Sequence, residues 1–180
     1  MNKLAFVALA TLIYSSVLAV AATQQAFMTR AMQTNLAEVQ MGKLAQEKGS
    51  TQQVKSFGQM LTKDHQANQQ KANQIAKQTG VTPPTSPSAV QKSDYDRLSK
   101  LSGAAFDRQF AAMMMDGHRN AINEFRREAR MKDAVGEYAK QTLPTLEKHL
   151  REAERLEHHG QIAGHFHLYL HRRRINRHLD

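Results

Sequence analysis

Apolar residues recur at steps of three and four along most of this 180-residue chain, and this spacing strongly limits the folds open to it. Such spacing places apolar side chains on one face of an α-helix, whereas a half-buried strand needs steps of two. No run with strand spacing of any length precedes residue 165. The first segment of this kind, from Ala26, is also rich in residues that favour helix. We therefore predict an all-α protein.

Glycine and proline divide the helical pattern into four predicted helices. Gly49 and Gly80 end the first two helices. Residues 80–88 hold three of the four prolines, so they form a connection rather than a helix interior, and residues 89–101 are partly helical. The third and fourth helices meet in a turn at residues 130–133. Two tight pairs joined by a long proline-rich link predict an up-down-up-down four-helix bundle.

The first 22 residues have the layout of a secretory signal peptide. A basic start at Lys3 leads into the apolar segment from Leu4 to Val20, and small residues follow at Ala21 and Ala22. We expect cleavage there, with export of a soluble protein to the periplasm or outer envelope. An uncleaved anchor is the alternative, because a membrane-spanning helix needs roughly 20 apolar residues. The absence of cysteine excludes disulfides and thiolate metal ligands.

Removal of the leader leaves one domain, residues 23–157, followed by a tail, residues 158–180, that we expect to be disordered. The net charge is +9, but both signs are mixed through the helical segments, which makes a nucleic-acid surface an unlikely assignment. The tail holds six of the nine histidines and a cluster of arginines: Arg172, Arg173, Arg174 and Arg177. It could associate weakly with an anionic envelope surface. The sequence identifies no other partner and no oligomeric state.

Polar residues interrupt the apolar stripe of every predicted helix. They are Glu38, Asp64 or its neighbour His65, His118 and His149. Measured from the turns that such a bundle places at one end, they lie roughly 16 to 27 Å deep at about 1.5 Å per residue. A carboxylate and several imidazoles in one layer can bind zinc, iron or manganese. The alternative is a layer of hydrogen bonds that fixes helix register without any metal.

Known catalytic patterns are absent from the sequence. It contains no phosphate-binding glycine loop, no dinucleotide fingerprint and no serine nucleophile elbow, so we assign no catalytic residue and favour a binding protein over an enzyme. Di-metal carboxylate bundles use Glu-x-x-His motifs, and this chain has none. A di-metal oxidase or peroxide-consuming enzyme is therefore the alternative rather than the first hypothesis.

An ordered set of short motifs resembles a bacterial exported ferritin-like family of unknown function that often carries an outer-membrane label. The motifs lie within residues 26–157 and are Glu38-Val39, Met41 to Ala45, Val54 to Gly58, Asp64-His65, Leu101 to Asp107, His118, Leu143-Pro144 and His149-Leu150. The resemblance implies an envelope-located ferritin-like four-helix domain without an established reaction. The polar positions that match the family pattern are Glu38, Asp64, His65, Asp107, His118 and His149.

The sequence thus leads to one hypothesis and two alternatives. The hypothesis is an exported, ferritin-like binding or stress-protective module whose site in the middle of the bundle holds a divalent metal. The alternatives are the oxidase or peroxide-consuming enzyme, and a polyanion-binding envelope protein that acts through its basic tail.

Overall fold

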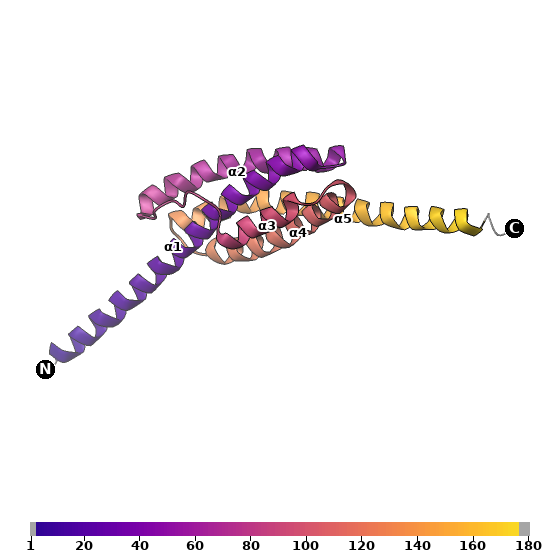
Figure 1. Ribbon diagram of the computed structural model, residues 1–180. Coiled ribbons are helices and arrows are strands. Elements are labelled where there is room, and N and C mark those ends of the chain that lie inside the picture. The colour runs from indigo at the N-terminus through magenta and orange to yellow at the C-terminus, as the bar shows by residue number, and fades with distance from the viewer. Residues whose placement is uncertain (1–2, 177–180) are drawn as a thin grey trace.

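The computed structural model describes the backbone of residues 3–176 and the side chains of residues 22–159. Over this range the chain forms five helices and no strand, which confirms the all-α prediction (Figure 1). They are α1 (Lys3–Lys48), α2 (Gln52–Thr79), α3 (Ala89–Ser99), α4 (Gly103–Glu128) and α5 (Ala134–Asn176). The side chains of the expected leader and of nearly all of the expected tail lie outside the described residues, so both assignments remain predictions.

Helices α1 and α2 form one hairpin, and α4 and α5 form another. Local sequence explains the helix ends. The Thr51 side chain accepts a hydrogen bond from the Val54 amide at the start of α2, and Gly80 adopts the left-handed conformation, with φ of 71°, that ends it. Residues 80–88 are not helical, and α3 then begins in a capping box formed by Ser88 and Gln91.

The two hairpins do not run in the order that we predicted. The backbone N–H and hydroxyl of Ser50 donate to the Asp107 carboxylate, which places the α1–α2 turn beside the start of α4. The side chain of Gln24 donates to Asp133 and places the α4–α5 turn beside α1, far from that first turn. The two tight turns therefore lie at opposite ends, and the up-down-up-down order is wrong. Helix α3 runs back along the molecule, so α2 and α4 run in the same direction (Figure 1).

Two hydrophobic clusters fill the interior, and a polar layer separates them along each of the four long helices. One cluster includes Phe27, Phe125 and Tyr138, and the other includes Phe57, Phe106 and Phe110. Six buried polar residues share the interior with these clusters: Asn35, Glu38, His65, His118, Thr142 and His149. All but Thr142 fall between residues of the two clusters in sequence, so each long helix contributes to one polar layer in the middle of the fold.

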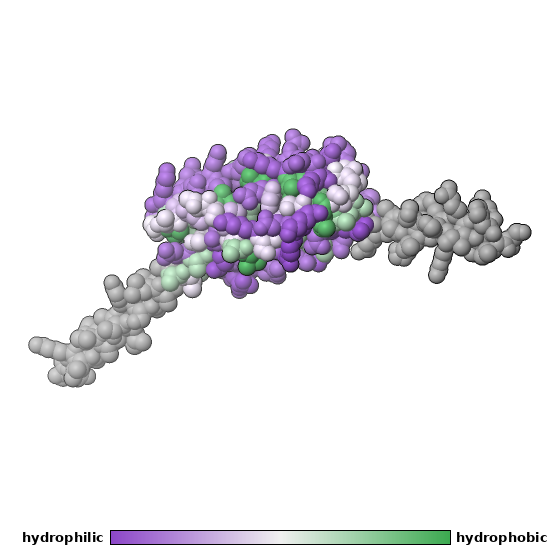
Figure 2. Space-filling view, in the orientation of Figure 1, coloured by the Kyte–Doolittle hydropathy of each residue, from purple (hydrophilic) through white to green (hydrophobic). Residues whose placement is uncertain are grey.

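On the face shown in Figure 2 the described surface is mostly hydrophilic, and hydrophobic residues appear as small separate areas. Among the residues described, no helix combines the length and the apolar character that crossing a membrane requires.

Candidate metal centre

Three histidines from three helices meet in the polar layer. His65 comes from α2, His118 from α4 and His149 from α5, and their side chains are at most 3% exposed. One ring nitrogen from each lies within 4.8 Å of the other two, and the ring centroids are 5.2 to 5.9 Å apart. The structure thus brings together three of the five residues that the sequence analysis selected.

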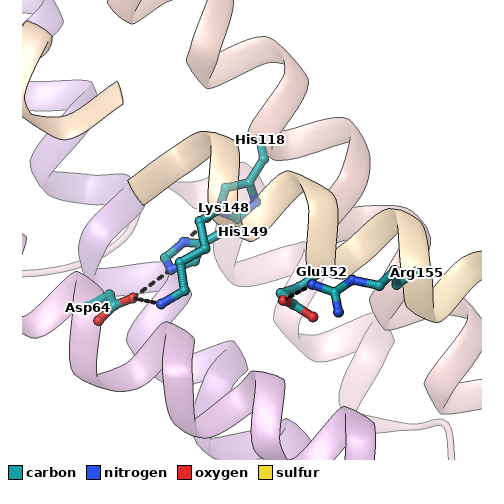
Figure 3. A network of polar contacts seen from close by, with 6 residues as sticks. All are labelled: Asp64, His118, Lys148, His149, Glu152 and Arg155. Carbon is teal, nitrogen blue, oxygen red and sulfur yellow. Dashed lines mark hydrogen bonds and ion pairs between the residues drawn. The ribbon is translucent and has the colours of Figure 1, made fainter. Parts of the chain in front are cut away.

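The hydrogen bonds of His118 and His149 fix which nitrogen of each ring carries its proton. Nδ1 of His118 lies 2.8 Å from the carbonyl oxygen of Met114, and a carbonyl can only accept. Nε2 of His149 lies 3.0 Å from a carboxylate oxygen of Asp64, which also accepts (Figure 3). These two nitrogens therefore donate. The remaining nitrogens, Nε2 of His118 and Nδ1 of His149, face each other at 3.2 Å.

His65 follows the same rule. Its Nδ1 donates over 2.9 Å to Oδ1 of Asn35, an oxygen that also accepts from Asn68 at 3.1 Å. Tyr138 and Thr142 bond to Asn68 in turn and hold this side of the layer in place. Nε2 of His65 is left buried without a hydrogen-bond partner. All three rings thus turn one hydrogen-free nitrogen toward the others.

Burial favours the neutral form of His65 and His149. It lowers the pKa of His149 from 6.5 to about 4, although the hydrogen bond to Asp64 opposes the shift. It also lowers the pKa of His65 well below its usual value, with a further contribution from His118 and His149. A neutral imidazole whose other nitrogen donates to an oxygen is the form of histidine that binds metal ions.

The two predicted carboxylates lie outside the group of three nitrogens. Asp64 is partly exposed and accepts a hydrogen bond from Nε2 of His149, the ring nitrogen that is not available to a metal. Its carboxylate also lies 3.6 Å from Nζ of Lys148 (Figure 3). Glu38 is buried, which raises the pKa of its carboxyl, whereas nearby His118 lowers it. One carboxyl oxygen of Glu38, Oε2, has no hydrogen-bond partner. Asp107, which matched the family pattern, lies at the α1–α2 turn instead and serves a structural role there.

Sequence reasoning missed the groups that orient the rings. Neither Asn35 nor Asn68 was selected from the sequence, and the Met114 carbonyl leaves no mark in a sequence. The three-residue spacing from Asn35 to Glu38 and from His65 to Asn68 could have indicated that the polar layer extends over almost a full turn of α1 and α2.

The arrangement suits a small metal ion. Zinc binds imidazole nitrogen at 2.0–2.1 Å, so tetrahedral ligands lie about 3.3 Å apart, close to the 3.2 Å between His118 and His149. The widest separation in the group, 4.8 Å, would have to shorten by roughly 1.5 Å for the same geometry.

Comparisons with known proteins agree with the fold and add no reaction. The fold is similar to the crystal structure of a DUF305 fragment from Deinococcus radiodurans, with a TM-score of 0.65, 16% sequence identity, and coverage of 76% of this chain and 96% of that chain. At this identity the likeness concerns the fold alone. No curated protein matches the sequence. Residues 14–156 match a family described as a domain of unknown function, and the chain therefore belongs to that family, DUF4142.

Proposed function

We propose that this domain binds one divalent transition-metal ion through Nε2 of His65, Nε2 of His118 and Nδ1 of His149. The observation that carries the proposal is the set of hydrogen bonds to Asn35, the Met114 carbonyl and Asp64, which leaves one nitrogen free on each of three buried rings whose ligand atoms lie within 4.8 Å of one another. Imidazole donors suit zinc and iron better than manganese, which prefers oxygen ligands. We therefore expect zinc or iron first and manganese after them.

A metal-free polar layer accounts for this geometry less well. In a hydrogen-bonded layer each buried nitrogen should find a donor or an acceptor. Here two hydrogen-free nitrogens oppose each other at 3.2 Å, and Nε2 of His65 is buried without any partner. A cation satisfies all three nitrogens at once, and a buried cation is in turn stabilised by the supporting carboxylate of Asp64.

The biological setting that we propose follows from the sequence. The domain is a ferritin-like four-helix module in which α3 belongs to the connection between the two hairpins, and the protein is exported to the cell envelope. Its role there is to bind metal, or to protect against metal-dependent stress. A single group of three histidines among the described residues supports one ion rather than the two of a di-metal oxidase.

Metal binding by the full-length protein, purified without an affinity tag, tests the proposal. We expect zinc to raise the melting temperature of the wild type, and His118→Ala to abolish the rise and to lose one equivalent of bound zinc. His158→Ala is the matched control, because this histidine is exposed on the same helix, α5, at the start of the tail. The other five tail histidines are present in both variants, so the difference between them compares the buried site with a single exposed tail histidine. If His118→Ala destabilises the metal-free protein by about 1–3 kcal/mol but leaves zinc binding unchanged, the layer is only structural.

A further inference from the structure

The candidate metal centre borders an open cleft. The cleft has a volume of about 400 Å³ and lies between α1, α3 and α4. His65 and His118 line it, whereas His149 is completely buried and does not. One liquid water occupies roughly 30 Å³, so the cleft has room for solvent and for a small ligand. Two of the three proposed ligands therefore border the cleft, although both side chains are buried.

Glu38 stands in the same cleft on the α1 side. Its side chain is only 7% exposed and lines the cleft together with His65 and His118. Its Oε2 atom has no hydrogen-bond partner, and the carboxyl is close enough to His118 for their charges to interact. The carboxyl nevertheless lies outside the group of three nitrogens that are within 4.8 Å of one another. Glu38 is therefore placed beside the centre at the edge of the cleft, with one buried carboxyl oxygen that has no hydrogen-bond partner.

Three protein ligands do not complete the coordination of these metals. Zinc sites with three protein ligands hold water or substrate in the fourth position, whereas closed structural sites use four protein ligands. The three histidines project from α2, α4 and α5, so α1 is the long helix that supplies no ligand, and its Glu38 is the acidic residue of α1 in the cleft.

Resting on the metal site proposed above, we propose that the bound ion keeps an open coordination position toward this cleft, where it takes an exchangeable water molecule or small anion next to Glu38. The Glu38 carboxylate accepts a hydrogen bond from that water molecule, opposes a bound anion through its charge, and is not a ligand of the metal. The centre is thus a reactive or ligand-binding site and not a closed structural one.

Cobalt(II) and azide provide the test on the full-length protein, because cobalt replaces zinc or iron and its visible absorption reports its ligands. We expect azide to change the spectrum of the cobalt-loaded wild type in a saturable way. The same titration of His118→Ala measures cobalt held elsewhere, including the tail, and is subtracted. Glu38→Gln should keep cobalt affinity within about threefold and bind azide about tenfold more tightly, since the carboxylate charge no longer opposes the anion.

Access through the cleft is tested at Gly117, which lines it one residue before His118. A Cβ atom at this position would meet nothing within 4 Å, so a larger side chain can enter the cleft without displacing its neighbours. We expect Gly117→Leu to weaken azide binding at least tenfold while cobalt affinity stays within about threefold. Gly117→Ala is the matched control and should bind azide as the wild type does. Equal azide affinity in the two variants would contradict the cleft as the route.

Two further outcomes separate this inference from the metal site itself. If one equivalent of cobalt binds in a manner that needs His118, but azide leaves the spectrum unchanged, the coordination is closed and the inference is overturned while the metal site stands. A loss of cobalt affinity of tenfold or more in Glu38→Gln would also overturn the inference, because Glu38 would then be the fourth ligand of a closed site. If the wild type shows no cobalt binding that depends on His118, both proposals are wrong.

Discussion

Nε2 of His118 lies 3.2 Å from Nδ1 of His149, and neither nitrogen carries a hydrogen to donate to the other. Both rings have already donated their single proton, one to the Met114 carbonyl and one to Asp64. Two lone pairs at this distance repel each other unless a proton or a metal ion lies between them. Burial disfavours the proton, since it lowers the pKa of His149 to about 4. The metal-free site is therefore destabilised in a way that a metal ion relieves.

The stability of the metal-free protein should depend on pH through His149. Its pKa falls from 6.5 in the unfolded chain to about 4 in the folded protein, so between these values only the unfolded chain binds the proton. The contribution of His149 is thus complete above pH 6.5 and is lost as the pH falls toward 4, by about 3 kcal/mol. We expect the difference in unfolding free energy between wild type and His149→Gln to shrink by that amount from pH 7 to pH 4.

Two other buried groups make this comparison with a variant necessary. His65 shifts in the same direction as His149, whereas burial raises the pKa of Glu38 and makes its contribution more favourable as the pH falls. The pH dependence of the wild type alone therefore mixes opposite effects. A difference between wild type and His149→Gln that stays constant over the pH range would contradict the burial of a neutral His149.

Asp64→Asn should weaken metal binding more than it weakens the fold. The carboxylate accepts from Nε2 of His149 and makes the ring a better ligand, and loss of such a partner commonly lowers metal affinity 10-fold to 100-fold. Titration calorimetry with zinc measures the change. Lys148→Gln is the control, because Lys148 is half exposed and lies 3.6 Å from the same carboxylate without touching the ring's free nitrogen. Similar losses in both variants would mean that net charge, not support of His149, controls affinity.

The sequence predicted the polar layer better than it predicted the path of the chain. Apolar spacing at three and four residues placed the inward face of each helix, and His65, His118 and His149 fell on or beside those faces. The order of the hairpins was wrong because α3, only 11 residues long, reverses the chain between them, and a short helix leaves a weak pattern. The layer was still predicted because His118 lies near the middle of α4, at a similar depth from either end.

The roles within the layer could not be read from the sequence. Spacing alone cannot show that Asp64 supports His149 across 85 residues, or that Glu38 stays apart from the three nitrogens. These relationships depend on ring rotation and on backbone acceptors such as the Met114 carbonyl, which are fixed only when the helices pack.

Asn35→Ala should allow the His65 ring to adopt both neutral tautomers instead of one. Asn35 supplies the oxygen to which Nδ1 of His65 donates, so its removal leaves a buried donor without an acceptor and costs about 1–3 kcal/mol. Nitrogen NMR of the imidazole should show a proton on Nδ1 of His65 in the wild type and a mixture of tautomers in the variant. Gln40→Ala is an exposed control on the same helix and should change neither the tautomer nor the stability. An unchanged tautomer in Asn35→Ala would show that other contacts orient the ring.

Gly58→Ala should weaken both the fold and the metal site, because α1 and α2 are in close contact there. A Cβ atom on Gly58 would lie 2.5 Å from the carbonyl oxygen of Gly42 and 2.8 Å from Cβ of Ala45, so the helices must separate. Such overpacking typically costs 1–3 kcal/mol. The pair of Asn35 and His65 joins the same two helices about two helical turns away, over 2.9 Å, and separation of the helices would loosen it.

The same substitution at Gly117 provides the contrast for Gly58→Ala. A Cβ atom there meets nothing within 4 Å, and alanine inside a helix is favoured over glycine, so Gly117→Ala should stabilise the protein by about 0.5–1 kcal/mol. Urea unfolding of the metal-free variants measures both effects, and zinc titration measures the consequence at the site. If Gly58→Ala loses stability but binds zinc as the wild type does, the spacing of α1 and α2 does not control His65. That result would mean that the orientation of the His65 ring depends on α2 and on the contacts of α2 with α5, and not on Asn35.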